Sequence, residues 1–232
     1  MIQLTNTVKH LIIINVLLFL ATIALNEQLY DLLAMHFIDN PLFKPWQIVT
    51  HIFMHGSVQH ILFNMIGLWM FGSSVEELVG RDKFLIIYFV AGIGAVLFSL
   101  GIDYVQYQNA YTNVINVGIS EFEFMKFVQE GSYTNNADVN TMVQKYNTSL
   151  VGASGALYGI MVTFGVLLPR AKMGLMFLPI MIEARIFIPL LLLSDVLFGV
   201  FKANSNVGHF AHIGGAIFGY LIIMYYKRKY RV

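Results

Sequence analysis

Residues 152–159 read Gly-Ala-Ser-Gly-Ala-Leu-Tyr-Gly and open an apolar run that continues through Leu168. A serine at the start of such a run needs a reason, because a buried polar group without a partner costs about 1–3 kcal/mol. The small residues around Ser154 allow another helix to approach closely. Ser154 is therefore either a packing residue between two helices or a side chain that performs chemistry.

The composition indicates a membrane protein. Of 232 residues, 57% are hydrophobic and 12% are charged, whereas a soluble domain carries roughly 25% charged residues. Crossing a hydrocarbon core of about 30 Å takes about 20 apolar residues. We expect a single all-α domain over residues 1–232, a bundle of six transmembrane helices. The predicted segments are about 8–26, 57–79, 83–102, 150–168, 184–201 and 207–226.

Lys and Arg placement predicts the orientation. The first segment lacks a convincing cleavage site, so we expect a retained helix and no cleaved signal. With the N-terminus inside, four basic residues fall outside: Lys44, Lys126, Lys145 and Lys202. The other basic residues fall on the inner side. Both termini are therefore expected in the cytoplasm, and we expect an integral protein of a bacterial cytoplasmic (inner) membrane.

Several classes of function are excluded or disfavoured. Cysteine is absent, which excludes disulfides, thiol catalysis and Cys-based metal or haem sites. The net charge is +1, and the basic cluster 227–231 is best explained as an inner-side anchor, so we expect no nucleic-acid partner. No cofactor is expected. The sequence leaves the oligomeric state open.

Two regions outside the spans stand out. Residues 27–56 mix apolar and charged side chains, and we expect an interfacial first loop of short helices half-sunk in the outer leaflet. Residues 103–149 are polar and separate the third and fourth spans. A connection this long is functional, partly disordered or a small helical insertion.

Spans two, four and six all enter the membrane from the same face, the outer one. Their polar residues fall within their first few turns: His60 and Asn64 in span two, Ser154 in span four, and His209 and His212 in span six. At about 1.5 Å per residue, these side chains lie at similar shallow depth. They can therefore meet in one layer that water reaches from outside.

This layer suits acyl transfer. A serine hydroxyl becomes a good nucleophile when a neutral imidazole takes its proton, and His212 is our candidate base for Ser154. His60 and Asn64, at i and i+4, can donate to an oxyanion, as can the Ser154 N–H. Tyr158, one turn after Ser154, is expected to point the same way and to stack on His212.

His209 is an alternative base, but it falls nearer the interface. No carboxylate is expected to complete a triad, because Asp195 lies on an odd-numbered span at a different depth. We therefore predict a dyad.

Glycines predict that spans four and six pack closely. Gly152, Gly155 and Gly159 lie in span four, and Gly215 and Gly219 lie in span six. Such spacing lets two helix backbones approach. Close approach is what a serine and a histidine on different helices require.

A metal site is the alternative explanation for His51, His55 and His60, since histidines at suitable spacing can share a cation. No glutamate lies between them as a metalloprotease helix requires. We therefore predict no metal and expect His51 and His55 to order the interface or the pocket.

Together these motifs resemble the rhomboid family of intramembrane serine proteases, over about 40–100 and 150–225. The resemblance implies six helices around a water-filled cavity, with Ser154 as nucleophile and His212 as base. It also implies that His60 and Asn64 form the oxyanion hole. The matching motifs, in family order, are His55-Gly56, His60-Ile61-Leu62-Phe63-Asn64, Gly152-Ala153-Ser154-Gly155, Tyr158-Gly159 and Ala211-His212-Ile213-Gly214-Gly215.

The chain departs from the family pattern in two places. Many members have Trp-Arg in the first loop, where this chain has Trp46-Gln47. The insertion 103–149 is longer than in compact bacterial members, so no role carries over to it. By analogy with the family, residues 184–206 are our candidate for the segment that moves to admit substrate.

The sequence thus predicts an intramembrane serine endopeptidase that cleaves transmembrane protein substrates in or beside their membrane segments, within the lipid bilayer. A non-catalytic rhomboid-fold protein that binds transmembrane segments is one alternative. A small transporter is another, and it predicts polar residues along the whole depth of the bundle.

Overall fold

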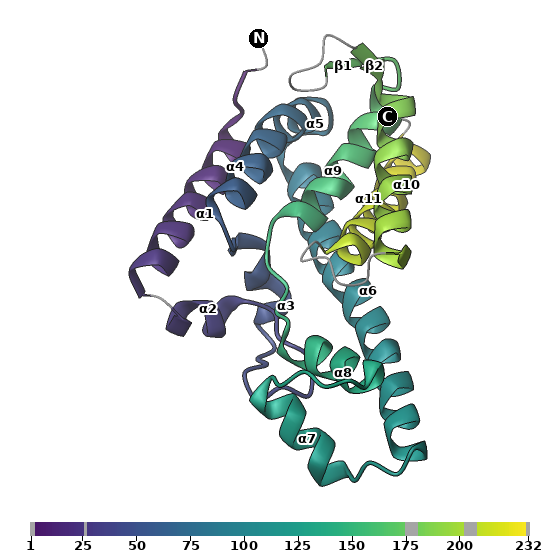
Figure 1. Cartoon of the computed structure of the whole chain (residues 1–232). Coiled ribbons are helices and arrows are strands. Elements are labelled where there is room, and N and C mark those ends of the chain that lie inside the picture. Colours follow the sequence, from purple (N-terminus) through teal and green to yellow (C-terminus); the bar gives the residue numbers. More distant parts are fainter. Residues whose placement is uncertain (1–2, 26, 175–180, 202–207, 231–232) are drawn as a thin grey trace.

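The computed structural model describes residues 3–25, 27–174, 181–201 and 208–230, which are mostly helical (Figure 1). A short antiparallel hairpin of β1 (Lys172–Gly174) and β2 (Met181–Glu183) follows α9. The helical elements are α1 (Asn6–Leu25), α2 (Glu27–Leu33), α3 (Gln47–Thr50), the 3-10 turn η1 (His51–Phe53), α4 (Val58–Gly67), the π-helical η2 (Leu68–Gly72), α5 (Ser73–Val79), α6 (Arg81–Asn116), α7 (Glu121–Glu130), α8 (Ala137–Asn147), α9 (Ser154–Leu167), α10 (Ala184–Phe201) and α11 (His209–Tyr230).

Within the described residues, α1, α6 and α10 are long and apolar enough to cross a membrane. Helix α9 is apolar but has 14 residues, and the second predicted span is divided into α4, η2 and α5. The predicted span 184–201 coincides with α10. Residues 26 and 207, where the first span was predicted to end and the last to begin, lie outside the described residues. The count of six membrane-crossing helices stays a prediction.

The insertion is helical. Helix α6 does not end near residue 102, as predicted, but continues to Asn116. The prediction was wrong because the polar stretch after 102 has a buried face, on which Tyr107, Ala110 and Val114 pack against α7 and α8. The insertion therefore has a hydrophobic core of its own, which also includes Phe37 from the first loop.

Helices α6, α9 and α11 pack against one another and form the centre of the bundle. The start of α1 and the end of α11 lie at the same end of the molecule as the β-hairpin, while α7 and α8 lie at the opposite end (Figure 1). This arrangement agrees with an even number of crossings between the termini. It puts the N-terminal ends of α4, α9 and α11 toward the insertion.

The first loop contains the short helices α2 and α3 and the turn η1. Its position at the membrane interface stays a prediction. Its centre is Gln47, whose side chain is fully buried and binds backbone groups along the loop. A neutral amide thus occupies the position where the family resemblance suggested an arginine.

Candidate active site

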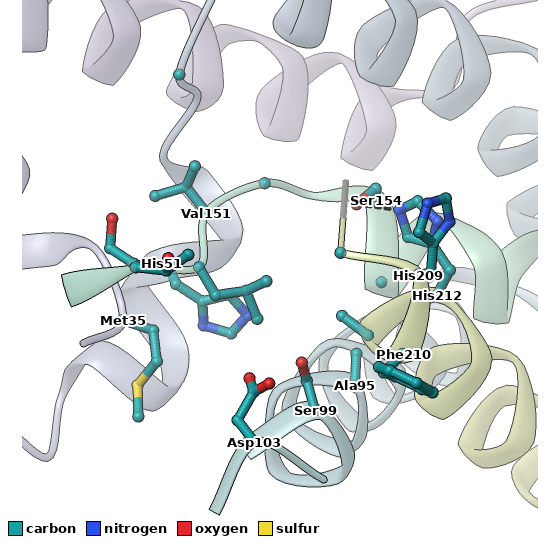
Figure 2. A pocket seen from close by; sticks show the side chains of 18 of the residues that line it. Met35, His51, Ala95, Ser99, Asp103, Val151, Ser154, His209, Phe210 and His212 are labelled. Carbon is teal, nitrogen blue, oxygen red and sulfur yellow. Dashed lines mark hydrogen bonds between the residues drawn. The ribbon is translucent and has the colours of Figure 1, made fainter. Parts of the chain in front are cut away.

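A cavity of about 860 Å³ lies between the first loop, the insertion and the N-terminal ends of α4, α9 and α11. Figure 2 shows Ser154 beside His209 and His212 on one side of it, with His51 and Met35 on the other. Every element for which the sequence predicts a candidate site residue therefore contributes to the wall of this cavity.

Ser154 and His212 are brought together across the α9–α11 contact. The Ser154 Oγ atom lies 3.0 Å from Nε2 of His212, which is hydrogen-bond distance. The Tyr158 ring stacks on the imidazole of His212 with centroids 4.2 Å apart and planes 9° apart. His212 is itself buried, so stacking and hydrogen bonding both restrict its orientation.

The segment before Ser154 is fixed to the first loop. Met35 and Leu150 exchange two backbone hydrogen bonds of 2.8 and 3.0 Å, and the Gly152 N–H donates to the His51 carbonyl at 2.9 Å. Gly152 has φ of 124°, a conformation that L side chains rarely adopt. The entry into α9 therefore depends on a glycine and on the first loop.

His60 and Asn64 lie against this same segment. A Cβ atom at Gly152 would be 2.6 Å from Nε2 of His60 and 3.7 Å from Nδ2 of Asn64. Helix α4 begins at the Ser57 cap, whose hydroxyl accepts from the His60 N–H at 3.1 Å. Asn64 Nδ2 is buried and has no hydrogen-bond partner among the described residues. An unpaired buried donor on the wall of the cavity that Ser154 also lines suits an oxyanion that forms only during reaction.

Glycines account for the closeness of α9 and α11. A Cβ atom at Gly215 would lie 1.9 Å from the Gly155 carbonyl oxygen. One turn further on, a Cβ atom at Gly219 would lie 2.4 Å from Cα of Gly159. The two backbones are in contact there, so no side chain larger than hydrogen fits between them.

The prediction that no carboxylate reaches the site was wrong. Oδ1 of Asp195 lies 3.1 Å from Nδ1 of His212 and 2.6 Å from Nδ1 of His209. The predicted depth of Asp195 was wrong, because Asp195 lies six residues before the C-terminal end of α10 at Phe201. At about 1.5 Å per residue this is within ~9 Å of that end, where α11 begins. The usable signal was a lone acidic residue in an apolar run.

His209 is placed as a partner of Asp195, while His212 faces Ser154. Among the described residues, the one group of histidine and carboxylate atoms close enough to hold a cation is Asp195, His209 and His212, within 4.8 Å of one another. The group that the sequence suggested for a metal, His51, His55 and His60, is not such a group.

His51 and His55 order the first loop. Nδ1 of His51 lies 2.9 Å from the Gln47 carbonyl, and the rings of His55 and His60 meet edge to face at 5.0 Å. Burial lowers the pKa of His51 and that of His55 to about 4. Both imidazoles are therefore neutral at physiological pH, which leaves the Nδ1–H of His51 as the donor to Gln47.

The fold and the site define a helical membrane protein with a serine and a histidine hydrogen-bonded at a cavity. A family model, the Rhomboid domain, matches residues 42–229. The chain therefore belongs to the rhomboid family, and it is an integral membrane protein.

Relatives come from bacteria and from mitochondria. The chain is 30% identical to Rhomboid protease AarA of Providencia stuartii over 78% of this chain and 56% of the relative. It is 29% identical to Presenilin-associated rhomboid-like protein A, mitochondrial, of Danio rerio over 83% of this chain and 41% of the relative. It is 30% identical to RHOMBOID-like protein 12, mitochondrial, of Arabidopsis thaliana over 91% of this chain and 55% of the relative. The chain thus spans about half the length of these relatives.

Proposed function

We propose that this chain is an intramembrane serine endopeptidase, which cleaves peptide bonds in or next to transmembrane segments of membrane proteins. The observation that carries the proposal is the 3.0 Å separation of Ser154 Oγ and His212 Nε2 at the edge of the cavity. Membership of a family with protease-named relatives supports it.

In this mechanism Nε2 of His212 takes the Ser154 proton as Oγ bonds to the substrate carbonyl carbon. The carbonyl electron pair moves onto its oxygen, where His60, Asn64 and the Ser154 N–H donate hydrogen bonds. One such donor is worth about 2.7–4 kcal/mol of barrier. The proton then passes from His212 to the leaving amine as the C–N bond breaks. Water from the cavity hydrolyses the acyl-enzyme by the same steps.

Tyr158, Gly152, Gly155 and Gly215 have supporting roles. Tyr158 holds the His212 ring by stacking. Gly152 leaves room for His60 at the oxyanion site, and the pair Gly155 and Gly215 sets the distance between α9 and α11. None of these groups needs a cofactor.

The substrates we propose are transmembrane proteins whose helices unwind locally. A peptide bond inside a regular helix is shielded, so small or helix-weakening residues near the scissile bond are the expected preference. The location we propose is a bacterial inner membrane, and the charge distribution supports an orientation with both termini in the cytoplasm. The cavity then faces the outer side.

Purified protein in liposomes with a membrane-anchored reporter tests the proposal. Wild type should cleave the reporter, while Ser154→Ala and His212→Ala should each lose at least about 10³-fold in kcat, as expected when a nucleophile or its base is removed. Full activity of either variant contradicts the proposal. Binding of the reporter without cleavage by wild type would favour the non-catalytic alternative.

A further inference from the structure

Asp195 is a buried carboxylate on α10, a helix with mostly exposed apolar side chains. It is the one acidic residue of α10, and it is 5% exposed. Its neighbours on the same helix, including Leu193, Val196 and Leu197, are exposed apolar side chains. A carboxylate inside the hydrocarbon region is strongly unfavourable unless it is paired. Asp195 therefore needs the partners that α11 supplies.

Those partners place Asp195 behind the proposed base. Its Oδ1 atom is shared by Nδ1 of His209 at 2.6 Å and Nδ1 of His212 at 3.1 Å. The other nitrogen of His212 meets Ser154 at 3.0 Å. Both ring nitrogens of His212 are thus engaged, one by a carboxylate and one by a hydroxyl.

A glycine near Asp195 lets α10 and α11 come close together. A Cβ atom at Gly199, one turn beyond Asp195, would lie 3.2 Å from Cβ of His209 and 3.5 Å from the Phe210 ring. The missing side chain at Gly199 lets the outer end of α10 lie against the start of α11. The position of Asp195 is therefore set by helix packing as well as by its hydrogen bonds.

We propose that Asp195 is a positioning residue that completes a Ser154–His212–Asp195 triad, with His209 as the second partner of the carboxylate. The proposal rests on the proposed function. Asp195 accepts the Nδ1–H of His212, which fixes the tautomer whose Nε2 lone pair faces Ser154. When the Ser154 proton moves to Nε2, the carboxylate stabilises the imidazolium and stays ionised throughout; it neither gives nor takes a proton.

The triad couples α10 to catalysis. Helix α10 has few buried residues, namely Ala184, Ile188, Asp195 and Gly199. Near its end at Phe201 it meets α11 through Asp195, through Gly199 and through the Phe198 ring, which stacks on His209. An outward displacement of that end would separate Asp195 from His212 and disorient the base.

The first experiment compares kcat and KM of full-length wild type, Asp195→Asn and Ser194→Ala in liposomes, with Ser154→Ala as the inactive reference. Asparagine keeps the size of aspartate but lacks its charge. We expect kcat of Asp195→Asn to fall at least about 10-fold, toward the ~10⁴-fold loss known for soluble triads, with little change in KM. Ser194→Ala, on the same helix, should match wild type. Wild-type kcat in Asp195→Asn would overturn the proposal.

The second experiment reads the His212 tautomer without using activity. Nitrogen-15 NMR of the histidines, with the His212 signal assigned by comparison with His212→Gln, should show His212 protonated on Nδ1 in wild type. Asp195→Glu should retain this signal, and Asp195→Asn should lose it. A His212 protonated on Nε2 in wild type overturns the proposal, even if a variant fails to fold. If wild type does not cleave, the proposed function fails, and the tautomer still decides the role of Asp195.

A third experiment separates the triad from a cation site formed by Asp195, His209 and His212. The triad predicts that a chelator leaves wild-type kcat unchanged. Loss of activity on chelation, restored by Zn²⁺, would overturn the triad, because a cation on Nδ1 of His212 would replace its proton.

Discussion

Gln47 is the residue that organises the first loop. Its amide oxygen accepts from the Lys44 N–H at 3.0 Å, and its amide nitrogen donates to the carbonyls of Asp31 and Leu42, each at 2.9 Å. Its backbone carbonyl pairs with the His51 ring. A neutral amide with both donors and an acceptor can satisfy these backbone groups without burying a charge.

We expect Gln47→Met to destabilise the protein by about 2–4 kcal/mol. Methionine fills the same volume but leaves the bound backbone groups unpaired, each at a cost of about 1–3 kcal/mol. The measurement is reversible unfolding in detergent micelles. Gln59→Met, at an exposed position on α4, is the matched control and should change stability by less than about 0.5 kcal/mol. Equal stabilities of the two variants would exclude this role for Gln47.

Residues of the site differ in how far sequence could predict them. The pairing of Ser154 with His212 followed from their matched depth on helices entering from one face. Asp195 was missed because its depth was judged by the parity of its helix, whereas the C-terminal end of α10 reaches the same layer as the start of α11. A residue's distance from the nearer helix end decides which side chains it can meet.

The contact between α9 and α11 is the element-scale feature on which the site depends. The closest approach is at Gly155 and Gly215, where a carbonyl oxygen occupies the place of a side chain. Because Ser154 precedes one of these glycines and His212 lies three residues before the other, their separation follows the interhelical distance.

Gly215→Ala should therefore reduce activity far more than its single methyl group suggests. The new Cβ would lie 1.9 Å from the Gly155 oxygen, a backbone atom that cannot rotate away, so the helices must separate. We expect at least a ~10²-fold loss of reporter cleavage and a destabilisation of about 1–3 kcal/mol. Gly101→Ala on α6, where a Cβ meets nothing within 4 Å, should retain activity. Normal cleavage by Gly215→Ala would show that α9 and α11 are not held this closely.

Across the whole molecule, α6 connects two hydrophobic cores. Phe84 and Tyr88 contribute to the bundle core, while Tyr107 and Val114 contribute to the core of the insertion. Lys145 of α8 binds Asp103 of α6 at 2.5 Å, on the wall of the cavity that Ser154 also lines. The insertion is thus an ordered part of the cavity wall.

This overall arrangement was only partly predictable. Apolar runs predicted α1 and α10 well, because lipid-facing helices are apolar over their whole length. The helices α7 and α8 fit one of the alternatives left open, a small helical insertion, whereas the continuation of α6 to Asn116 was missed. The buried faces of these helices are short and interrupted by polar residues. The π-helical η2 carries no sequence signal that we recognised.

The central claim, that His212 activates Ser154 as a nucleophile, is tested most directly by covalent labelling. Purified wild type in detergent is treated with a fluorophosphonate, and the modified residue is mapped by mass spectrometry. The account predicts a single adduct on Ser154 that His212→Ala abolishes while the variant stays folded. An unlabelled Ser154 in wild type, or equal labelling in His212→Ala, would contradict it.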